Sequence, residues 1–463
     1  MRTAGVLRLF TVAALTAAST TAAAAQTPPP APPETTKAAV TQAGPTDQSA
    51  AAGATDQAGA PDQQQKPPAK PAPEQATPPP QTAPPTGSAS SRQAAIEQGQ
   101  AAKVPELHPY QPNKAERIFE QVDTILSGGT LRWHPFFDSA YSGGGFTLGL
   151  GHINYVSAYN YIDLRGSWTF SNYKRVEAEF IAPRLFNRRG KLSVLGGWRE
   201  ATQVGFYGIG NDTIIEDKTN YLFNQPYGAA LLTLYPNRKV LMLQGGVELS
   251  RWHQEPGTGT TPSVETVYTP ATLPGLGAEV TYLHTQGAVG LDWRTSPGYT
   301  RRGAYIAATL HDYKDNDDNF GFQLAEYEGI AHLPILREAW VLSFHARVQT
   351  AYDKGGQDTP FFMLPALGGG SSLRGYPSWR WRDKNSLLLQ GEWRIMVNRY
   401  LDTAFFYDAG KVAARTSDLD LNHLHDDFGF GVRFHGPFAT PLRVELAHGK
   451  EGLSFIFASS ASF

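Results

Sequence analysis

The last eleven residues of this 463-residue chain, LSFIFASSASF from Leu453 to Phe463, decide its fold. Side chains of an extended strand point alternately to its two faces, so Phe455, Phe457 and Phe463 share one face. Small and serine side chains occupy most of the other face. The pattern predicts a strand with an aromatic face at the carboxyl end of the chain.

The same period-two alternation recurs upstream. In residues 386–397, Leu387, Leu389 and Trp393 share one face and polar side chains the other. We count sixteen runs: 133–141, 144–155, 159–170, 174–183, 191–205, 219–234, 239–252, 280–294, 303–313, 319–332, 338–352, 385–397, 401–413, 427–436, 441–448 and 452–463.

The connections between these runs favour a membrane barrel over a soluble sandwich. Connections after even-numbered runs are short, whereas several after odd-numbered runs are long, notably 206–218, 253–279, 353–384 and 414–426. Outer-membrane barrels have short periplasmic turns and long external loops, and their strands need about 9–11 residues to cross the bilayer. We therefore predict an all-β fold, a 16-stranded antiparallel transmembrane β-barrel over residues 131–463, with both termini on the periplasmic side.

The residues before the barrel have a different composition. Residues 1–25 carry Arg2 and Arg8, an apolar run and a small-residue end, which is typical of a secretory signal peptide. Residues 26–104 are rich in Pro, Ala and Gln and contain no aromatic side chain, so we expect a disordered linker. A polar start at Asn113 and apolar residues at helical spacing predict a short amphipathic helix over 113–127.

Charge and cysteine content exclude several function classes. Lys and Arg total 40 against 42 Asp and Glu, a formal net charge of −2, so no strongly basic surface points to a nucleic acid partner. The chain has no cysteine, which removes disulfides and thiol chemistry. No nucleotide loop or dinucleotide fingerprint is present, and we expect no cofactor.

One local cluster raises the question of a metal. His423, His425, Asp426 and Asp427 lie close together in the sequence, but within a predicted external loop. We expect a solvated charge cluster there and no metal site. A Gly-x-Ser-x-Gly nucleophile elbow is also absent from the sequence, so we expect no enzyme activity.

Two motifs are more specific. The longest loop contains LGGGSSLRGY, residues 367–376, in which Gly369 and Gly370 precede Arg374, Gly375 and Tyr376. Small residues at such a site allow the backbone to approach its neighbours closely.

A second motif is FYDAG, residues 406–410, which contains Phe406, Asp408 and Gly410. These motifs, together with FYGIGND at 206–212, resemble the BamA/TamA family of outer-membrane assembly proteins, the bacterial surface-antigen superfamily. The carboxy-terminal aromatic residues, with Phe463 last, resemble the signal that the assembly machinery reads in outer-membrane proteins.

The resemblance implies a barrel of sixteen strands with five after the signature loop, and our count also gives five. It further implies that Arg374 folds into the lumen and meets an acidic residue of the inner wall. Asp408 is the first candidate and Glu392 the second. Alternation also directs both carboxylates inward, because an ionised carboxylate facing lipid is costly.

Other polar side chains of the wall should line a water-filled interior. The candidates are His345, Arg347, Arg394, Arg433, Arg443 and Glu445. We refer to Arg374, Asp408 and Glu392 together as the lumen lock.

The chain departs from the family ahead of the barrel. Typical members carry periplasmic POTRA domains, whereas residues 26–104 lack the apolar content of a packed domain. We expect a Gram-negative outer-membrane protein with a periplasmic amino-terminal extension. It would assist insertion or translocation of proteins through a seam between first and last strands, and the alternative is a passive pore or structural barrel plugged by the Arg374 loop. Expected partners are membrane lipid, the assembly machinery during its own insertion, and a client outer-membrane or secreted protein.

Overall fold

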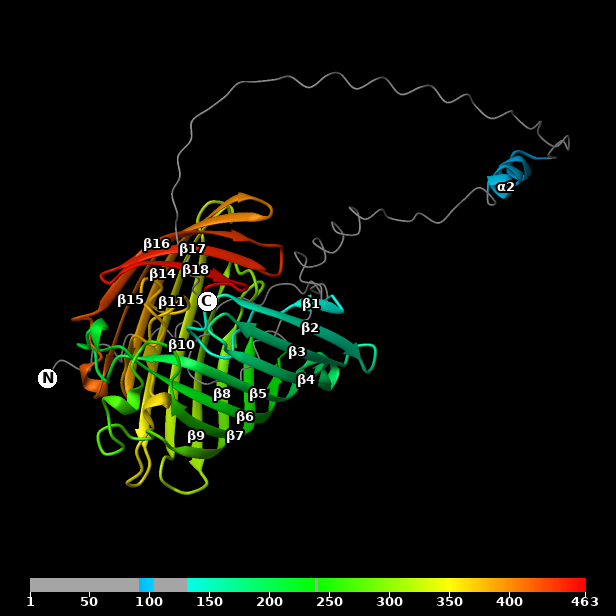
Figure 1. Cartoon of the computed structure of the whole chain (residues 1–463). Coiled ribbons are helices and arrows are strands. Elements are labelled where there is room, and N and C mark those ends of the chain that lie inside the picture. The colour runs from blue at the N-terminus through cyan, green and yellow to red at the C-terminus, as the bar shows by residue number, and fades with distance from the viewer. Residues whose placement is uncertain (1–90, 104–130, 238–239) are drawn as a thin grey trace, which may run out of the picture.

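A computed structural model describes residues 91–103, 131–237 and 240–463 (Figure 1). The predicted signal peptide 1–25, the predicted helix 113–127 and most of the predicted linker 26–104 lie outside the described residues. No helix in the described part of the chain has the length and apolar character needed to span a membrane.

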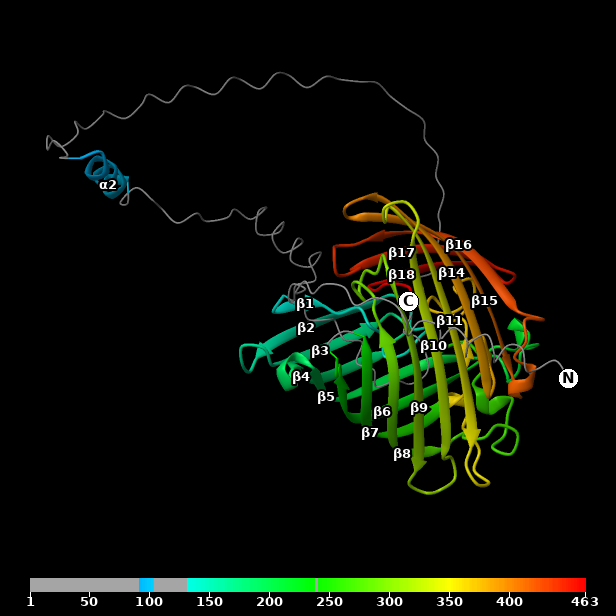
Figure 2. The same cartoon turned by 180° about the vertical axis from the view of Figure 1, so that it is seen from behind.

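Sixteen strands form one antiparallel sheet within the described residues. They are β1 (Trp133–Pro135), β2 (Thr147–Tyr155), β3 (Tyr161–Thr169), β4 (Lys174–Arg184), β5 (Gly190–Phe206), β6 (Thr219–Leu234), β7 (Leu241–Pro256), β8 (Glu279–Asp292), β9 (Gly303–Asp315), β10 (Phe322–Pro334), β11 (Trp340–Asp353), β14 (Asn385–Asn398), β15 (Leu401–Ala413), β16 (His425–Phe434), β17 (Leu442–Gly449) and β18 (Gly452–Ala458). Each strand pairs with its sequence neighbours in this order. The sheet curls into a barrel, as the two opposite views show (Figures 1 and 2).

The remaining elements are short. Strands β12 (Ala366–Leu367) and β13 (Trp381–Arg382) form a two-stranded sheet inside the connection between β11 and β14. The helices are α2 (Arg92–Lys103), α4 (Leu185–Arg188) and the 3₁₀ turns η3 (Ile215–Asp217), η4 (Val264–Thr266), η5 (Phe361–Met363) and η6 (Thr416–Asp418).

Helix α2 lies where we expected unstructured chain. Its sequence, RQAAIEQGQAAK, is made mostly of good helix formers, and Ser91 Oγ accepts a hydrogen bond of 3.2 Å from the Ala94 backbone N–H at its start. Our prediction for 26–104 weighed only the missing apolar content, which excludes a packed domain but not a single helix. The linker prediction is therefore wrong for residues 92–103.

The sixteen-stranded prediction is confirmed, with five strands after the longest loop. Most strand bounds lie within three residues of the predicted ones, but the first and last strands are much shorter than expected. The predicted run 133–141 forms a strand only over Trp133–Pro135, and the predicted run 452–463 stops at Ala458. Within the described residues no ladder joins β1 to β18, so the sheet is not closed.

Outward and inward faces have opposite chemistry. Large apolar side chains are exposed along the outer wall, among them Phe405, Tyr407, Phe428, Phe430 and Phe455. Charged side chains are buried on the inner wall, as expected for strands with lipid on one side and a filled lumen on the other. A large aromatic core, which includes Trp252, Phe361 and Trp379, packs where the long loops fold into the barrel mouth.

Candidate functional site

The loop of residues 354–384, between β11 and β14, folds into the barrel and carries the site. Leu367, Leu373, Tyr376 and Trp381 of this loop are buried against wall residues. The chain turns sharply at Gly368, whose φ of +110° is disfavoured for residues with a side chain. A Cβ at Gly368 would also lie 2.2 Å from the Pro377 carbonyl oxygen. The glycine run therefore permits the tight turn that delivers Arg374 to the wall.

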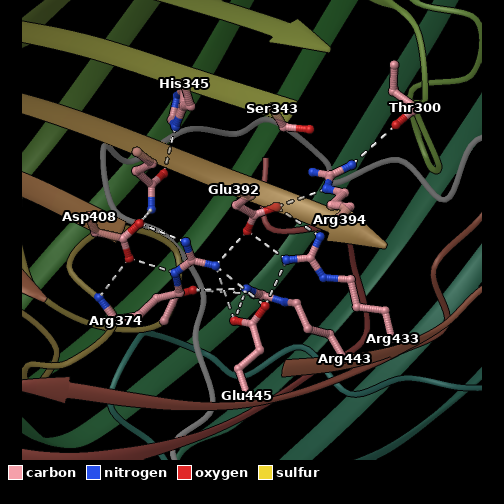
Figure 3. Close-up of polar contacts among 12 residues, drawn as sticks. Thr300, Ser343, His345, Arg374, Glu392, Arg394, Asp408, Arg433, Arg443 and Glu445 are labelled. Atoms are coloured by element: carbon pink, nitrogen blue, oxygen red, sulfur yellow. Dashed lines mark hydrogen bonds and ion pairs between the residues drawn. The ribbon is translucent and has the colours of Figure 1, made fainter. Parts of the chain in front are cut away.

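Arg374 is buried and binds Asp408 on β15 with two hydrogen bonds (Figure 3). Its Nε lies 2.6 Å from Oδ2 and its Nη2 lies 2.7 Å from Oδ1, which is a bidentate arrangement. The guanidinium carbon lies 3.5 Å from the centroid of the Phe406 ring. Burial alone would lower the pKa of Arg374, but Asp408 and Glu445 raise that pKa well above its ordinary value.

Glu392 on β14 is the second carboxylate that Arg374 reaches. Arg374 Nη1 donates to Glu392 Oε1 at 2.7 Å. Arg433 on β16 donates to both oxygens of Glu392, at 2.6 and 2.9 Å, and Arg394 Nε donates at 2.9 Å. Three buried arginines therefore surround one carboxylate (Figure 3).

Strand β17 completes the network through Glu445 and Arg443. Glu445 accepts hydrogen bonds from Arg433 at 2.9 Å and from Arg443 at 2.8 Å, and it lies 3.4 Å from Arg374 Nη1. Arg443 also donates to the Gly370 carbonyl oxygen at 3.3 Å from each Nη. The network thus joins the loop to four consecutive strands, β14 to β17.

Gly375 and Tyr376 bring the loop backbone against the wall. A Cβ at Gly375 would lie 2.6 Å from Asp427 Cβ and 2.7 Å from the Gly449 nitrogen, so only glycine fits there without displacement. The Tyr376 hydroxyl donates to the Asp426 carbonyl at 2.9 Å and accepts from the Lys450 backbone N–H at 3.2 Å. Gly375 therefore lies against β16 and the end of β17, and Tyr376 contacts β16 and the turn that follows β17.

The other motif residues also meet this loop. The Gly369 N–H donates to the carbonyls of Leu373 and Tyr376, at 3.1 and 3.0 Å, and closes the turn. Gly410 lies beneath the loop, because a Cβ there would be 2.9 Å from Leu367 Cδ1.

The segment 206–212 is brought to the same region from far away in the sequence. The Gly210 N–H donates to the Arg382 carbonyl at 2.8 Å. The Asn211 side chain accepts from the Val412 N–H at 3.1 Å and donates to the His423 carbonyl at 3.0 Å. This segment therefore clamps the signature loop and the loop of residues 414–424 together.

The structure brings together every residue of the predicted lumen lock. Sequence reasoning placed Arg394, Arg433, Arg443 and Glu445 on the inner wall but treated them as the lining of a watery interior. They are instead members of the charge network. Because these four residues alternate with outward apolar residues, the sequence indicated that their side chains point inward. Nothing in the sequence indicated that they lie close to Arg374.

His345 and Arg347 also lie on β11, but they do not touch Arg374. His345 hydrogen-bonds through Nδ1 to Gln390 Oε1 at 2.7 Å, and Gln390 donates to Asp408 at 3.1 Å. Gln390 therefore links His345 to the network. The Nε of Arg347 is buried without a hydrogen-bond partner within the described residues.

The carboxy-terminal aromatics do not share one face, which corrects the expectation for Phe463. Phe455 is exposed on the outer wall and Phe457 is half-buried. Phe463 instead lies inside the barrel, with its ring 5.1 Å from that of His345. Alternation continues through the tail sequence, but the strand ladder ends where β17 begins, so the last five residues turn inward.

The histidine and aspartate cluster has other contacts. The His425 ring stacks on Trp381 at 3.7 Å, and its Nε2 lies 2.8 Å from the Asn211 carbonyl oxygen. In the part of the chain that the structure describes, no group of three His, Cys, Asp or Glu residues is placed to hold a metal ion.

Comparison with known proteins relates this geometry to one superfamily. Residues 301–452 match the Omp85 superfamily domain, and this range includes both the signature loop and the FYDAG strand. Curated proteins gave no match.

Solved structures with the same kind of barrel include BamA from Haemophilus ducreyi lacking POTRA domains 1–3. That match has a TM-score of 0.50 at 14% identity and covers 71% of this chain and 68% of that chain. CdiB from Escherichia coli has a TM-score of 0.47 at 11% identity, with 71% and 62% covered. CdiB from Acinetobacter baumannii has a TM-score of 0.44 at 11% identity, with 67% and 55% covered. The domain match and the BamA fold confirm the resemblance that the motifs indicated.

Proposed function

Because this chain is an outer-membrane β-barrel that carries an Omp85 superfamily domain over residues 301–452, we propose that it assists the insertion or translocation of proteins at the outer membrane. The proposed route is the seam between β1 and β18. The observation that carries this proposal is the missing ladder at that seam in an otherwise continuous sixteen-stranded sheet.

The seam is weak for reasons that lie in both strands. β1 has three residues and ends at Pro135, which has no N–H to donate to a ladder. β18 has seven residues, and its outer edge is unpaired within the described chain. The two sides meet through the Phe146 and Phe457 rings, whose centroids are 5.6 Å apart. Side-chain packing therefore takes the place of backbone hydrogen bonds.

An unpaired edge is a template for an added strand. Its free N–H and C=O groups pair readily with another extended chain, which is the β-augmentation mode of recognition. A client strand that enters between β1 and β18 would gain backbone hydrogen bonds without breaking a ladder first. By contrast, opening β10 from β11 would break a register that runs from Phe322↔Asp353 to Pro334↔Val341.

The charge network supports this proposal by holding the wall beside the seam. It ties β14, β15, β16 and β17 to the loop, and none of its charged residues lies on β18 or β1. The wall therefore stays in place up to β17 when the seam opens. The signature loop would act as a brace, and the protein would need no catalytic step.

A disulfide across the seam tests the proposal. The chain has no cysteine, so the pair Phe146→Cys and Phe457→Cys introduces a single crosslink. The matched control is Trp393→Cys with Phe405→Cys, two outward aromatics that face each other in the β14–β15 ladder. Each pair is expressed in a deletion strain, and the outer-membrane proteome is quantified with and without reductant.

We expect the deletion to deplete a set of outer-membrane or secreted proteins. The seam pair should restore that set only under reducing conditions, whereas the control pair restores it under both. Full restoration by the oxidised seam pair would refute the seam, and an unchanged proteome after deletion would refute the proposed function.

A passive pore is the second candidate, and the observation that favours it is the position of the signature loop. Arg374 and its loop fill the lumen as a plug would. A plugged pore predicts a small current in planar bilayers that rises when Arg374→Ala releases the loop. Silence of both proteins would exclude a pore.

The proposed partners follow from this role. The barrel contacts outer-membrane lipid through its apolar outer face, and its own insertion would require the assembly machinery. The client is an outer-membrane or secreted protein. The residues ahead of the barrel would form a periplasmic extension of a Gram-negative outer-membrane protein.

A further inference from the structure

The two ends of the barrel differ in charge. The seven short turns, 156–160, 185–189, 235–240, 293–302, 335–339, 399–400 and 435–441, contain nine Lys and Arg residues and one acidic residue, Glu338. The eight connections at the opposite end, from 136–146 to 450–451, contain eight Lys and Arg and twelve Asp and Glu residues. Short turns of an outer-membrane barrel lie on its periplasmic side, so the basic end meets the inner leaflet of the membrane.

Three neighbouring turns of this end carry exposed arginines. Arg302 ends the β8–β9 turn, Arg337 lies in the β10–β11 turn and Arg399 lies in the β14–β15 turn. The strands that these turns join are consecutive in the sheet. Arg301 links the first two turns, because its Nη2 donates to the Glu338 carbonyl oxygen. We refer to Arg302, Arg337 and Arg399 as the basic rim.

No carboxylate of the described chain matches the charges of the basic rim. All three side chains are exposed, and none of them forms an ion pair within the described residues. Arg294 of the β8–β9 turn differs, since its guanidinium donates to Asp292 at 2.8 and 3.0 Å. The rim guanidinium groups therefore remain available to an external anion, and their planar donors match the oxygens of a phosphate.

Exposed apolar side chains lie beside the basic rim. β10 ends at Pro334, and Ile335 and Leu336 of the following turn are each 55% exposed. Trp293, which follows β8, and Trp340, which begins β11, are also exposed. Tryptophan is favoured at the membrane–water interface, where apolar side chains next to basic ones contact acyl chains. A soluble anion would pair with the arginines but leave these apolar side chains in water, whereas a lipid contacts both.

We propose that the basic rim and the apolar side chains beside it bind an anionic phospholipid of the inner leaflet. The headgroup phosphate accepts hydrogen bonds from arginines of the rim. The acyl chains lie along the outward rings of Trp340 and Trp393, whose centroids are 5.3 Å apart. The bound lipid fixes the depth of the barrel in the membrane on the side formed by β8–β15. Lipid binding at this site needs neither a client nor an open seam.

Native mass spectrometry of the purified full chain in detergent tests the site. The probes are phosphatidylglycerol, which is anionic, and phosphatidylethanolamine, which is zwitterionic, with the same acyl chains. Wild type should bind phosphatidylglycerol more tightly. A rim variant, with each arginine of the basic rim changed to Gln, should lose affinity for phosphatidylglycerol by about fivefold per arginine and keep its affinity for phosphatidylethanolamine. The matched control combines Lys218→Gln, Arg415→Gln and Lys450→Gln, which removes the same charge from exposed positions at the opposite end. It should bind both lipids as wild type does.

Two further probes separate a lipid from a soluble partner. Ile335→Ser combined with Leu336→Ser should weaken the binding of both lipids, because the apolar contact is lost. A hexaglutamate peptide should bind wild type more weakly than phosphatidylglycerol does. Tighter binding of the peptide would identify an acidic protein as the partner and overturn the proposal. Equal binding of the two lipids by wild type, or an unchanged preference in the rim variant, would also overturn it.

Photocrosslinking locates the lipid on the unaltered chain. Phosphatidylglycerol that carries a diazirine near its headgroup should crosslink within 293–302, 335–340 or 393–400, and the same group on phosphatidylethanolamine should show no preference for these segments. Crosslinks spread evenly around the barrel would contradict the site. Because neither assay contains a client, their failure is distinct from that of the proposed function, which the proteome experiment measures.

Discussion

Arg374 donates two hydrogen bonds to Asp408, at 2.6 and 2.7 Å, and both side chains are completely buried. The pair joins a loop to the wall strand that lies 34 residues later in the chain. Two charges at this depth are stable only because each is matched by the other and by further hydrogen bonds. A side chain that makes only one of these two hydrogen bonds therefore cannot replace Arg374 in holding the loop against the wall.

Arg374→Ala should destabilise the barrel, because it leaves Asp408 buried without its counter-ion. The loss expected for breaking a buried pair is about 3–5 kcal/mol. Arg374→Lys should recover little, since one ammonium cannot replace the bidentate contact. Urea unfolding in detergent measures the change. Arg415→Ala, in an exposed pair with Asp418, is the control and should shift the midpoint hardly at all. A wild-type midpoint for Arg374→Ala would contradict the lumen lock.

Glu392→Gln should be about as harmful as Arg374→Ala, because three buried arginines lose their shared charge. The two changes act on one network, so the double variant should be less destabilised than the sum of the single variants, by about 0.5–3 kcal/mol. A double-mutant cycle by urea unfolding gives the coupling. Strict additivity would show that Arg374 and Glu392 act independently.

Gly375→Ala should prevent the loop from seating, since the new methyl group would lie 2.6 Å from Asp427 Cβ and 2.7 Å from the Gly449 nitrogen. Overpacking of this kind costs about 1–3 kcal/mol. Limited proteolysis of residues 354–384 on the folded barrel should reveal a released loop. Gly329→Ala, where a Cβ would meet nothing within 4 Å, should leave the loop protected. Equal protection in both variants would mean that the loop does not depend on this close approach.

Asn211→Ala should loosen the contact between segment 206–212 and the loop of residues 414–424. It removes the acceptor of the Val412 N–H and the donor to the His423 carbonyl. A buried N–H left without an acceptor costs about 1–3 kcal/mol. Hydrogen exchange should rise in residues 414–424. Asp212→Ala, at the exposed neighbouring position, should leave exchange in that loop unchanged.

The sequence predicted the strands of the barrel wall better than it predicted the contacts inside the barrel. Alternation placed most strands within a few residues, because lipid on one side and a polar lumen on the other enforce a period of two. It also directed Asp408 and Glu392 inward. It could not show where the strand ends, since ASSASF alternates as a strand does, whereas the Phe463 ring lies beside His332 and His345, on strands more than a hundred residues earlier. The sequence also did not predict the hydrogen bonds that Glu445 accepts from Arg433 and Arg443. These contacts depend on the curvature of the barrel, which the alternation of side chains within one strand does not encode.

Arg380 links the signature loop to the hairpin beside the seam, and its removal should loosen β18. Its Nε donates to Glu451 at 2.8 Å in the β17–β18 turn, while its Nη groups donate to Thr213 at 2.8 and 2.6 Å. Without this contact the last hairpin loses a tether to the loop that fills the lumen. Arg380→Ala should therefore raise hydrogen exchange in residues 452–458 while β14 and β15 keep their protection.

Glu451→Gln should have a similar effect on β18, because it removes the charge at the other end of the same contact. Lys450→Ala is the matched control, as Lys450 is exposed and lies 3.8 Å from Asp426. If the seam is the route of client entry, the Arg380→Ala protein should also let the Phe146→Cys and Phe457→Cys pair oxidise more slowly, since the two sides would spend less time in contact. Unchanged exchange in β18 together with unchanged oxidation would show that the loop does not control the last hairpin.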